Sequence, residues 1–376
     1  MDLVIKTKEE VEAFLSGCAF YGTGGGGDTS AGRTSLYRCL DEGREIVLTD
    51  PDTIDDDALY CNAFFMGSIA PRTQEVIDEM NKNGYTDENV KYVLEDILVG
   101  AVETLEKYLG KKISALIVAE PGGSNTACCM AAAYKMGIAC LDGDSAGRAI
   151  PEMENGLCCI RGYDCLPAAY CDAWGNKSLT LEAASNTSME RVGKFLSQAS
   201  YGLMGEAAYV LPGKMLKTVF MPHTLSRCFE VGKVIKTSSR ETLLADIAKA
   251  ADGKIAAKGI VHDFKPTDAN GYYAGTYEIT GTDEFAGNEY KIWFKNENHI
   301  LWKNGTPLMT SPDLISLVSL DTGEPILNSY INEGEKVGVI LTRSHDFYHE
   351  PASIASFGPR YFGFDFDFKS FEEAEV

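Results

Sequence analysis

The chain has 376 residues, which is long enough for two domains that each bury a hydrophobic core. Apolar residues make up 45% of the chain and charged residues 24%, so we expect an ordinary globular protein. The net charge of −21 argues against nucleic acid or an anionic membrane surface as a partner, because both attract Lys and Arg. We therefore expect a small-molecule substrate. The sequence leaves open whether the chain forms a homo-oligomer.

The N-terminal residues lead straight into a charged helix and do not have the pattern of a signal peptide. Residues 1–6 run into a helix that Thr7 is placed to cap, with Glu10 as its capping-box partner. With no export signal and no apolar run of membrane-spanning length, we expect a cytoplasmic protein. The 11 cysteines would then be small buried apolar residues in a reducing compartment. No Cys-x-x-Cys pair indicates zinc, and one cysteine acting as a nucleophile stays an open alternative.

A glycine-rich run follows this helix and is the most unusual segment of the chain. It reads Gly22-Thr23-Gly24-Gly25-Gly26-Gly27-Asp28. Consecutive glycines lose much backbone freedom on folding, so they are kept where the backbone needs a positive φ or a close approach to another group. The hydroxyl of Thr23 and the carboxylate of Asp28 suggest that this group is a small polar ligand. A flexible linker is the alternative, but apolar residues before the run and a patterned helix after it favour an ordered loop.

Gly22, Gly24 and Gly27 also match the Gly-x-Gly-x-x-Gly fingerprint of dinucleotide-binding folds. A predicted strand over 45–49, followed by Asp50, extends the match. The fingerprint, however, needs a strand before the glycines, so that the pyrophosphate meets the N-terminus of the next helix. Because a helix precedes the glycines here, a dinucleotide-dependent oxidoreductase remains only an alternative function.

Strands and helices alternate through the first half of the chain. Apolar strands are predicted over 58–65, 113–119 and 138–141, with helical segments between them that include one from about 88 to 108. Continuous apolar strands in this alternation predict a mostly parallel sheet covered on both faces. The class that we predict is therefore α/β.

The composition changes after about residue 166. From residue 251 on, short strands separated by Gly, Asn, Asp and Pro predict a β-rich, barrel-like domain. We therefore expect an N-terminal α/β sandwich domain over 1–166 and a C-terminal β-rich domain over 167–376.

Acidic residues follow two of the predicted strands at the edge where an open parallel sheet binds ligands. Glu120 ends one strand, and Asp142 and Asp144 end the next. If the loop of Asp28 shares that edge, the converging carboxylates suit acid/base or hydrolytic chemistry, with Asn125 and Arg148 as polar partners. The candidate catalytic residues are thus Asp142, Asp144, Glu120 and Asp28. In a purely structural alternative, the two aspartates cap the following helix and Glu120 pairs with Arg148.

A divalent metal is a further possibility, because the Asp-x-Asp turn at 142–144 offers oxygen ligands. Among the five histidines, only His345 and His349 have ligand-like spacing, and that spacing works only on a helix. His223 opens an apparent helix and is more typical of a cap than of a base. No cofactor is predicted, and the metal requirement stays open.

With these residues in view, the chain resembles the S-methyl thiohydantoin desulfurase family, whose genes lie beside hydantoinase and oxoprolinase genes. The resemblance begins at the glycine run and continues in order through Phe65-Met66-Gly67, Glu120-Pro121-Gly122-Gly123-Ser124-Asn125, the stretch from Asp142 to Glu152, Pro222-His223-Thr224-Leu225-Ser226, Asn296-Glu297-Asn298, Pro312-Asp313-Leu314-Ile315, Asp321-Thr322-Gly323-Glu324-Pro325 and the stretch from Gly358 to Asp365. His223 stands where the family has a glycine, and Pro121 stands where an aliphatic residue is commoner.

The resemblance implies an N-terminal α/β domain and a C-terminal β-rich domain. It also implies hydrolysis of an S-methylated thiohydantoin to the hydantoin and methanethiol. Asp142 or Asp144 would then be the general base, and Arg148 would balance charge or bind a substrate carboxylate. The substrate-binding residues would be Thr23, Gly24, Gly25, Gly26, Gly27, Asn125, Arg148 and His223. An accessory subunit of a hydantoinase- or oxoprolinase-type complex remains an alternative function.

Overall fold

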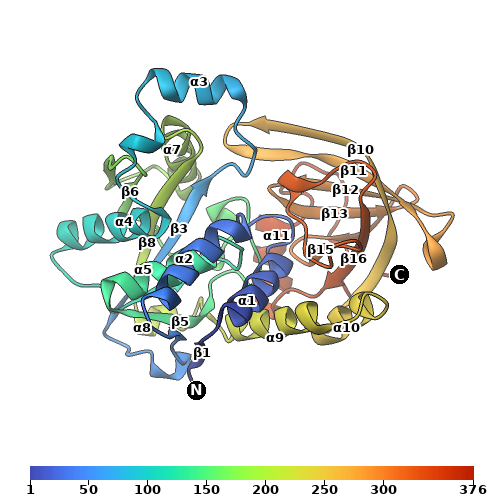
Figure 1. Ribbon diagram of the computed structural model, residues 1–376, viewed down its shortest axis with the longest axis horizontal. Helices are drawn as coiled ribbons and strands as arrows, with labels where there is room; N and C mark the ends of the chain where they lie inside the picture. Colours follow the sequence, from blue (N-terminus) through green and yellow to red (C-terminus); the bar gives the residue numbers. More distant parts are fainter.

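The computed structural model describes residues 1–376 and contains two large sheets with helices between and around them (Figure 1). Its helices are α1 (Lys8–Tyr21), α2 (Thr29–Asp41), α3 (Gln74–Lys82), α4 (Leu94–Leu109), α5 (Asn125–Met136), α6 (Leu157–Ile160), α7 (Asn186–Ala199), α8 (Gly213–Leu216), α9 (Thr224–Thr237), α10 (Leu243–Ala250) and α11 (Pro351–Phe357). Its strands are β1 (Leu3–Ile5), β2 (Ile46–Leu48), β3 (Leu59–Gly67), β4 (Ala115–Val118), β5 (Ala139–Asp144), β6 (Ala168–Cys171), β7 (Lys177–Thr180), β8 (Leu203–Pro212), β9 (Met221–Pro222), β10 (Lys254–Ala269), β11 (Tyr272–Gly281), β12 (Glu289–Lys295), β13 (Glu297–Lys303), β14 (Thr306–Thr310), β15 (Leu314–Ser319) and β16 (Lys336–Thr342). None of the helices combines the length and apolar character that crossing a membrane requires.

The N-terminal sheet has the strand order β7-β6-β8-β3-β4-β5-β9. The predicted α/β class is confirmed, and β3, β4 and β5 form over the three apolar segments expected to be strands. The sheet is mixed, however, and not mostly parallel. Only β3–β4 and β4–β5 pair in parallel, whereas β8 returns along β3 and the remaining pairings are antiparallel. Buried strands of both orientations are apolar throughout, so their composition does not reveal direction.

Strands beyond residue 166 still belong to this first sheet, since β6 to β9 pair within it. The chain enters the second sheet only at β10. The strand expected over 45–49 forms as β2, but it pairs with β1 in a separate two-stranded sheet. It meets the main sheet through one bridge between Thr49 and Leu141.

The C-terminal sheet is antiparallel, with the strand order β14-β13-β12-β11-β10-β16-β15. It curls into a half-barrel, which confirms the predicted β-rich, barrel-like region. Register shifts within β10 and between β12 and β13 help the sheet to bend.

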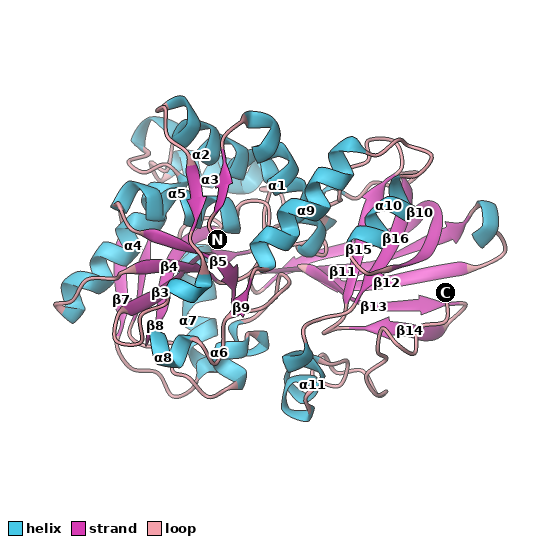
Figure 2. Ribbon diagram, turned by 90° about the horizontal axis from the view of Figure 1, so that it is seen from below, coloured by secondary structure: helices cyan, strands magenta, loops and turns pink.

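Helices α1 and α9 lie between the two sheets (Figure 2). Thr7 caps α1 and forms the expected capping box with Glu10. The largest hydrophobic core contains residues from both helices together with Leu314, Val318 and Ile340 of the second sheet. The two sheets are therefore joined by a shared apolar core, and the loops around that junction are held in fixed positions.

Candidate functional site

A cavity lies where the carboxyl ends of β3, β4 and β5 meet the C-terminal half of the chain. Its volume is about 130 Å³, which is enough for several water molecules. Apolar side chains from β3 and from the loop after β5 form much of its wall. The polar side chains with a bearing on chemistry are Asn62, Glu120, Asn125, Glu190, Lys194, Tyr209 and Glu297.

Glu120 comes from the turn after β4, as the sequence predicts, and lies in this cavity. One of its carboxylate oxygens accepts a hydrogen bond from Asn125 Nδ2 at 2.7 Å, and the other accepts one from the Ile150 backbone N–H at 2.6 Å. Asn125 is itself fixed by the Phe65 N–H, which donates to its Oδ1 at 2.9 Å. Burial raises the pKa of Glu120 to about 7, so this held carboxyl can both accept and release a proton near neutral pH.

Glu297 reaches the same cavity from β13, on the other side of the junction. Glu297 is 2% exposed, and its Oε2 atom has no hydrogen-bond partner in the chain. Burial, together with the nearby carboxyl of Glu120, raises the pKa of Glu297 well above its ordinary value. The buried environment therefore favours the protonated form of Glu297, and one of its oxygens is left without a hydrogen bond.

Two more unpartnered polar atoms belong to residues that line the cavity. Asn62 donates from Nδ2 to Ser145 Oγ at 3.3 Å, but its Oδ1 has no partner. The hydroxyl of Tyr209 is buried and also has none. Buried polar groups are nearly always hydrogen-bonded, so a group of such atoms around one cavity indicates a polar ligand. Together they offer an acceptor at Asn62, a donor at Tyr209 and an acid at Glu297.

The glycine run packs between the two halves of the molecule. A Cβ atom at Gly25 would lie 1.8 Å from Glu297 Oε1, and one at Gly26 would lie 2.5 Å from the Cα atom of Gly122. A Cβ atom at Gly27 would lie 1.8 Å from Ser124 Oγ. The close approach inferred from these glycines is thus to the chain itself. Gly26 and Gly27 also line the cavity, whereas Thr23, Gly24 and Gly25 do not.

Arg148 is fully buried, and it lies outside the cavity. Its five N–H groups donate to the Thr23 hydroxyl and to the backbone carbonyls of Ala149, Asn298, Pro312 and Asp313, at 2.9 to 3.1 Å. A guanidinium has five donors and no acceptor, so none is left for a substrate carboxylate. The pairing with Glu120 considered as a structural alternative is not among its hydrogen bonds. Arg148 instead ties the glycine run and the C-terminal domain together.

Asp142 and Asp144 are buried, do not line the cavity and hold the start of α9. Asp142 accepts hydrogen bonds from the Ser226 N–H at 2.9 Å, the Ser226 hydroxyl at 2.6 Å and His223 Nδ1 at 3.1 Å. Asp144 accepts from the Ala146 and Gly147 backbone and from the hydroxyl of Thr224. Hydrogen bonds from the chain therefore hold both carboxylates in place. The helix that they anchor is α9, which packs next to β5 although three other helices come between them in the sequence.

The remaining sequence candidates also lie outside the cavity. Asp28 caps α2 by accepting from the Ser30 N–H at 2.7 Å, and Tyr330 donates to its other oxygen. His223 has a φ of +63° at the start of α9 and bonds to Asp142. Of the cysteines, Cys158 lines the cavity, and burial raises the pKa of its thiol to about 12. A thiol held protonated in this way is a poor nucleophile.

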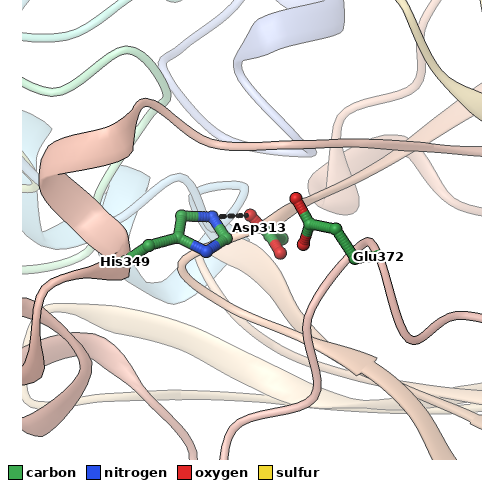
Figure 3. Close-up of side chains that lie close together, drawn as sticks. All are labelled: Asp313, His349 and Glu372. Atoms are coloured by element: carbon green, nitrogen blue, oxygen red, sulfur yellow. Dashed lines mark hydrogen bonds and ion pairs between the residues drawn. The ribbon is translucent and has the colours of Figure 1, made fainter.

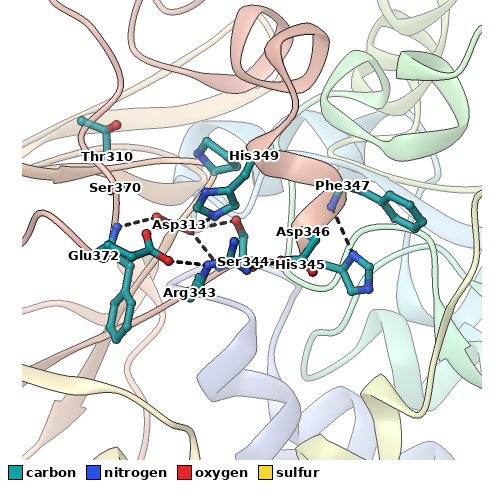
Figure 4. Close-up of polar contacts among 12 residues, drawn as sticks. Thr310, Asp313, Arg343, Ser344, His345, Asp346, Phe347, His349, Ser370 and Glu372 are labelled. Atoms are coloured by element: carbon teal, nitrogen blue, oxygen red, sulfur yellow. Dashed lines mark hydrogen bonds and ion pairs between the residues drawn. The ribbon is translucent and has the colours of Figure 1, made fainter.

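A second group of titratable side chains lies near the C-terminus (Figure 3). It brings together Asp313, His349 and Glu372, with His349 Nε2 3.0 Å from Asp313 Oδ1. Asp313 also accepts from the N–H and hydroxyl of Ser344 and from the Phe371 N–H, and Glu372 pairs with Arg343 (Figure 4).

These partners leave the group poorly suited to a metal. Protein donors already occupy both oxygens of Asp313, and a guanidinium lies where a cation would have to approach Glu372. The spacing of His345 and His349 predicts a pair of metal ligands only on a helix. In the structure His345 accepts a hydrogen bond from the Phe347 N–H and is not in the group. We interpret the cluster as an anchor for the C-terminal segment.

Sequence reasoning did not single out Glu297, Asn62, Tyr209, Glu190 or Lys194 as site residues. Glu297 lay within the stretch Asn296-Glu297-Asn298 that carried the family resemblance, and this was the available signal. Asn62 lies on β3 just before the quoted Phe65-Met66-Gly67, and the others lie on β8 and α7, which contain none of the quoted motifs. They come together with Glu120 only through folding.

Two family models match almost the entire chain. The model described as S-Me-THD-like, N-terminal domain matches residues 9–182, and the model described as S-Me-THD-like, C-terminal domain matches residues 184–371. Among solved structures, the crystal structure of a protein from Chromobacterium violaceum is similar, with a TM-score of 0.75. That match has 19% sequence identity and covers 99% of this chain and 100% of the other, so it shows a common fold. No curated protein matches this chain.

Proposed function

Since this chain belongs to the S-Me-THD-like family, we propose that it is a hydrolase that removes the methylthio group from an S-methylated thiohydantoin-type ring. The observation that carries the proposal is the pair of carboxyl groups, Glu120 and Glu297, which line one cavity in unlike environments. Glu120 is held by two donors and has a pKa of about 7, whereas Glu297 has an oxygen without a partner and burial raises its pKa well above the ordinary value. Such a pair can supply a base and an acid to the same substrate.

The reaction needs a base for water and an acid for the ring. Glu297 donates its proton to the ring nitrogen of the thioimidate while water adds to the adjacent carbon and Glu120 accepts a proton from that water. The C–S bond of the tetrahedral intermediate then breaks, and the departing thiolate takes the proton from Glu120. The new hydroxyl group becomes a carbonyl as its proton returns to Glu297. The products are methanethiol and the hydantoin, and both carboxyl groups end as they began.

The other unpartnered atoms suit the edge of such a ring. Asn62 Oδ1 can accept a hydrogen bond from a ring N–H, and the Tyr209 hydroxyl can donate to a ring carbonyl. These bonds would give the buried polar atoms partners and fix the ring relative to Glu120. These steps need no metal, because the two carboxyl groups supply the base and the acid.

The test is release of methanethiol from S-methyl thiohydantoins by the full chain, with and without a chelator. We expect Glu120→Gln and Glu297→Gln each to lower kcat/KM by about 100-fold or more, because each removes a proton-transfer group. Glu182→Gln, at an exposed position outside the cavity, is the control and should leave the rate unchanged. Circular dichroism would establish that all three variants are folded.

Retention of full activity by both cavity variants would contradict the assigned roles. Absence of methanethiol with every ring tested would contradict the proposed activity itself. In that case co-purification with a larger partner would favour the accessory-subunit alternative. Stabilisation of the chain by NAD or NADP would favour the oxidoreductase alternative.

A further inference from the structure

We propose that the side-chain amide of Asn296 binds the oxygen that water brings to the ring carbon as the methylthio group leaves. This inference rests on the proposed function and assigns that site a further residue. Asn296 lines the cavity next to Glu297 and is 5% exposed. Its Oδ1 atom accepts from the Tyr273 N–H at 3.0 Å, so Nδ2 is the end that is left, and it donates to no other atom of the chain.

A turn of a single residue presents Asn296 to the cavity. Asn296 lies between β12 and β13, and its neighbours Lys295 and Glu297 pair across the turn. Its φ of +58° is in the left-handed region, which asparagine adopts more readily than most residues. Its backbone N–H donates to the Tyr273 carbonyl at 2.6 Å, in addition to the side-chain bond. These bonds fix the amide, so the donor is in place before a ligand binds.

The glycine run supports this turn. Asn328 donates from Nδ2 to the Asn296 carbonyl at 2.8 Å, and its own N–H donates to the Gly24 carbonyl at 2.8 Å. A Cβ atom at Gly24 would lie 2.5 Å from Asn328 Nδ2, so a larger residue would disturb this contact. The Asn298 N–H donates to the Thr23 carbonyl at 2.8 Å. Residues of the run that do not line the cavity thus hold the turn that does.

A second asparagine shows what this backbone conformation needs for structure alone. Asn304 has a φ of +50°, and its backbone N–H and Oδ1 make the same two bonds, to Glu289, at 2.7 and 2.8 Å. Its Nδ2 atom, however, donates to Asn288 Oδ1 at 2.9 Å. The backbone therefore accounts for asparagine at both positions, but Asn296 keeps an unused donor beside a cavity. Because buried polar groups are nearly always hydrogen-bonded, this donor indicates a ligand.

The position of Asn296 next to Glu297 indicates which ligand atom receives the bond. In the proposed reaction Glu297 protonates the ring nitrogen and later takes back the proton of the new hydroxyl group. Asn296 and Glu297 enter the cavity from one turn, so both address this edge of the ring. A donor here stabilises the new oxygen as it becomes a carbonyl. The S-methylated substrate has no oxygen at this carbon, so the bond forms only as the reaction proceeds.

The experiment compares Asn296→Gly with Asn304→Gly. Both variants keep the left-handed backbone and lose a bond to a backbone N–H, but only the first removes a donor from the cavity. We expect Asn296→Gly to lower kcat for methanethiol release by about tenfold or more. Its KM should change by less than about threefold, because the substrate does not use the donor. Asn304→Gly should change neither value. If Asn296→Gly does not fold, Asn296→Asp keeps the bond to Tyr273 and should show the same loss.

Ligand binding tests the contact without turnover. A hydantoin and the thiohydantoin with the same substituent differ only in oxygen against sulfur at the carbon that water attacks, and sulfur is the weaker acceptor. Matched pairs with methyl, carboxamidoethyl and carboxyethyl substituents would be compared by titration calorimetry. We expect the unaltered protein to bind the hydantoin more tightly by about fivefold or more, and Asn296→Gly to lose this preference.

Equal binding of the two rings by the unaltered protein, or binding of neither, would overturn the inference. A preference or a kcat that is unchanged in Asn296→Gly would do the same. If no S-methyl ring releases methanethiol but the preference is present and depends on Asn296, the proposed activity fails and the contact stands. If methanethiol is released without that preference, the contact fails and the activity stands.

Discussion

At the scale of single residues, the environment of each carboxyl group separates chemistry from structure. Asp142 receives three hydrogen bonds from the chain and does not line the cavity, whereas Glu297 lines it and has an oxygen without any partner. A saturated carboxylate stabilises the fold, and an unsaturated one is available to a ligand. Glu297 meets this criterion, Glu120 is the acid/base candidate beside it because it lines the cavity with a pKa of about 7, and the two aspartates are anchors.

The pKa of Glu120 makes a pH-dependent contribution to stability. Burial raises it from 4.5 to about 7, so the folded chain favours the protonated form. That contribution is fully present below pH 4.5 and is lost as pH rises through 7. We expect Glu120→Gln, which stays neutral, to gain about 3 kcal/mol in unfolding free energy relative to the wild type between pH 4.5 and 8. Denaturant titrations of both proteins across this range would measure the difference, and a constant difference would contradict the assignment.

At the scale of elements, the glycine run acts by letting two loops pack against each other. Gly26 and Gly43 make a matched pair, with φ values of +74° and +77°. A Cβ atom at Gly26 would meet the Gly122 backbone, whereas one at Gly43 would meet nothing within 4 Å. We expect Gly43→Ala to cost about 1–2 kcal/mol for its φ alone. Gly26→Ala should cost at least about 1–3 kcal/mol more, because the loops must move apart. Chemical denaturation of both variants tests this, and equal losses would contradict it.

The start of α9 is a second element whose position depends on buried side chains. In Asp142→Asn, one acceptor oxygen is replaced by a donor that faces the Ser226 hydroxyl and His223. We expect a loss of about 1–3 kcal/mol in unfolding free energy, because buried donors lose their acceptor. Methanethiol release per folded molecule should change by less than about threefold. A 100-fold loss of turnover in a fully folded variant would instead restore Asp142 as the base.

At the scale of the whole molecule, Arg148 joins the two halves of the chain. It donates to carbonyls of Asn298, Pro312 and Asp313 in the C-terminal half and to Thr23 in the glycine run. The cavity lies at this junction, so its geometry depends on how the two halves are held. This arrangement explains how a fully buried arginine serves structure, because the chain accepts all of its hydrogen bonds.

Removal of this arginine should therefore weaken the junction. We expect Arg148→Met to lower the unfolding free energy by about 3–5 kcal/mol, because several buried carbonyls lose their donors. Arg161→Met, which removes a surface ion pair with Glu350, should cost at most about 1 kcal/mol. Thermal and denaturant unfolding would show the contrast. Similar losses for the two variants would mean that the junction is held mainly by the shared apolar core.

The sequence by itself determined the α/β class, the β-rich second half, the family and the place of Glu120 and Asn125. These follow from periodicity, capping and short motifs, which act between residues close together in the chain. Strand direction in the first sheet, and the neighbours of each acid, depended on contacts between distant segments. Asp142 and Glu120 look alike as acids at strand ends, yet α9 covers one while the cavity borders the other. Only the tertiary structure brought Glu297, Asn62 and Tyr209 to Glu120, because burial and hydrogen-bond saturation are properties of the packed chain.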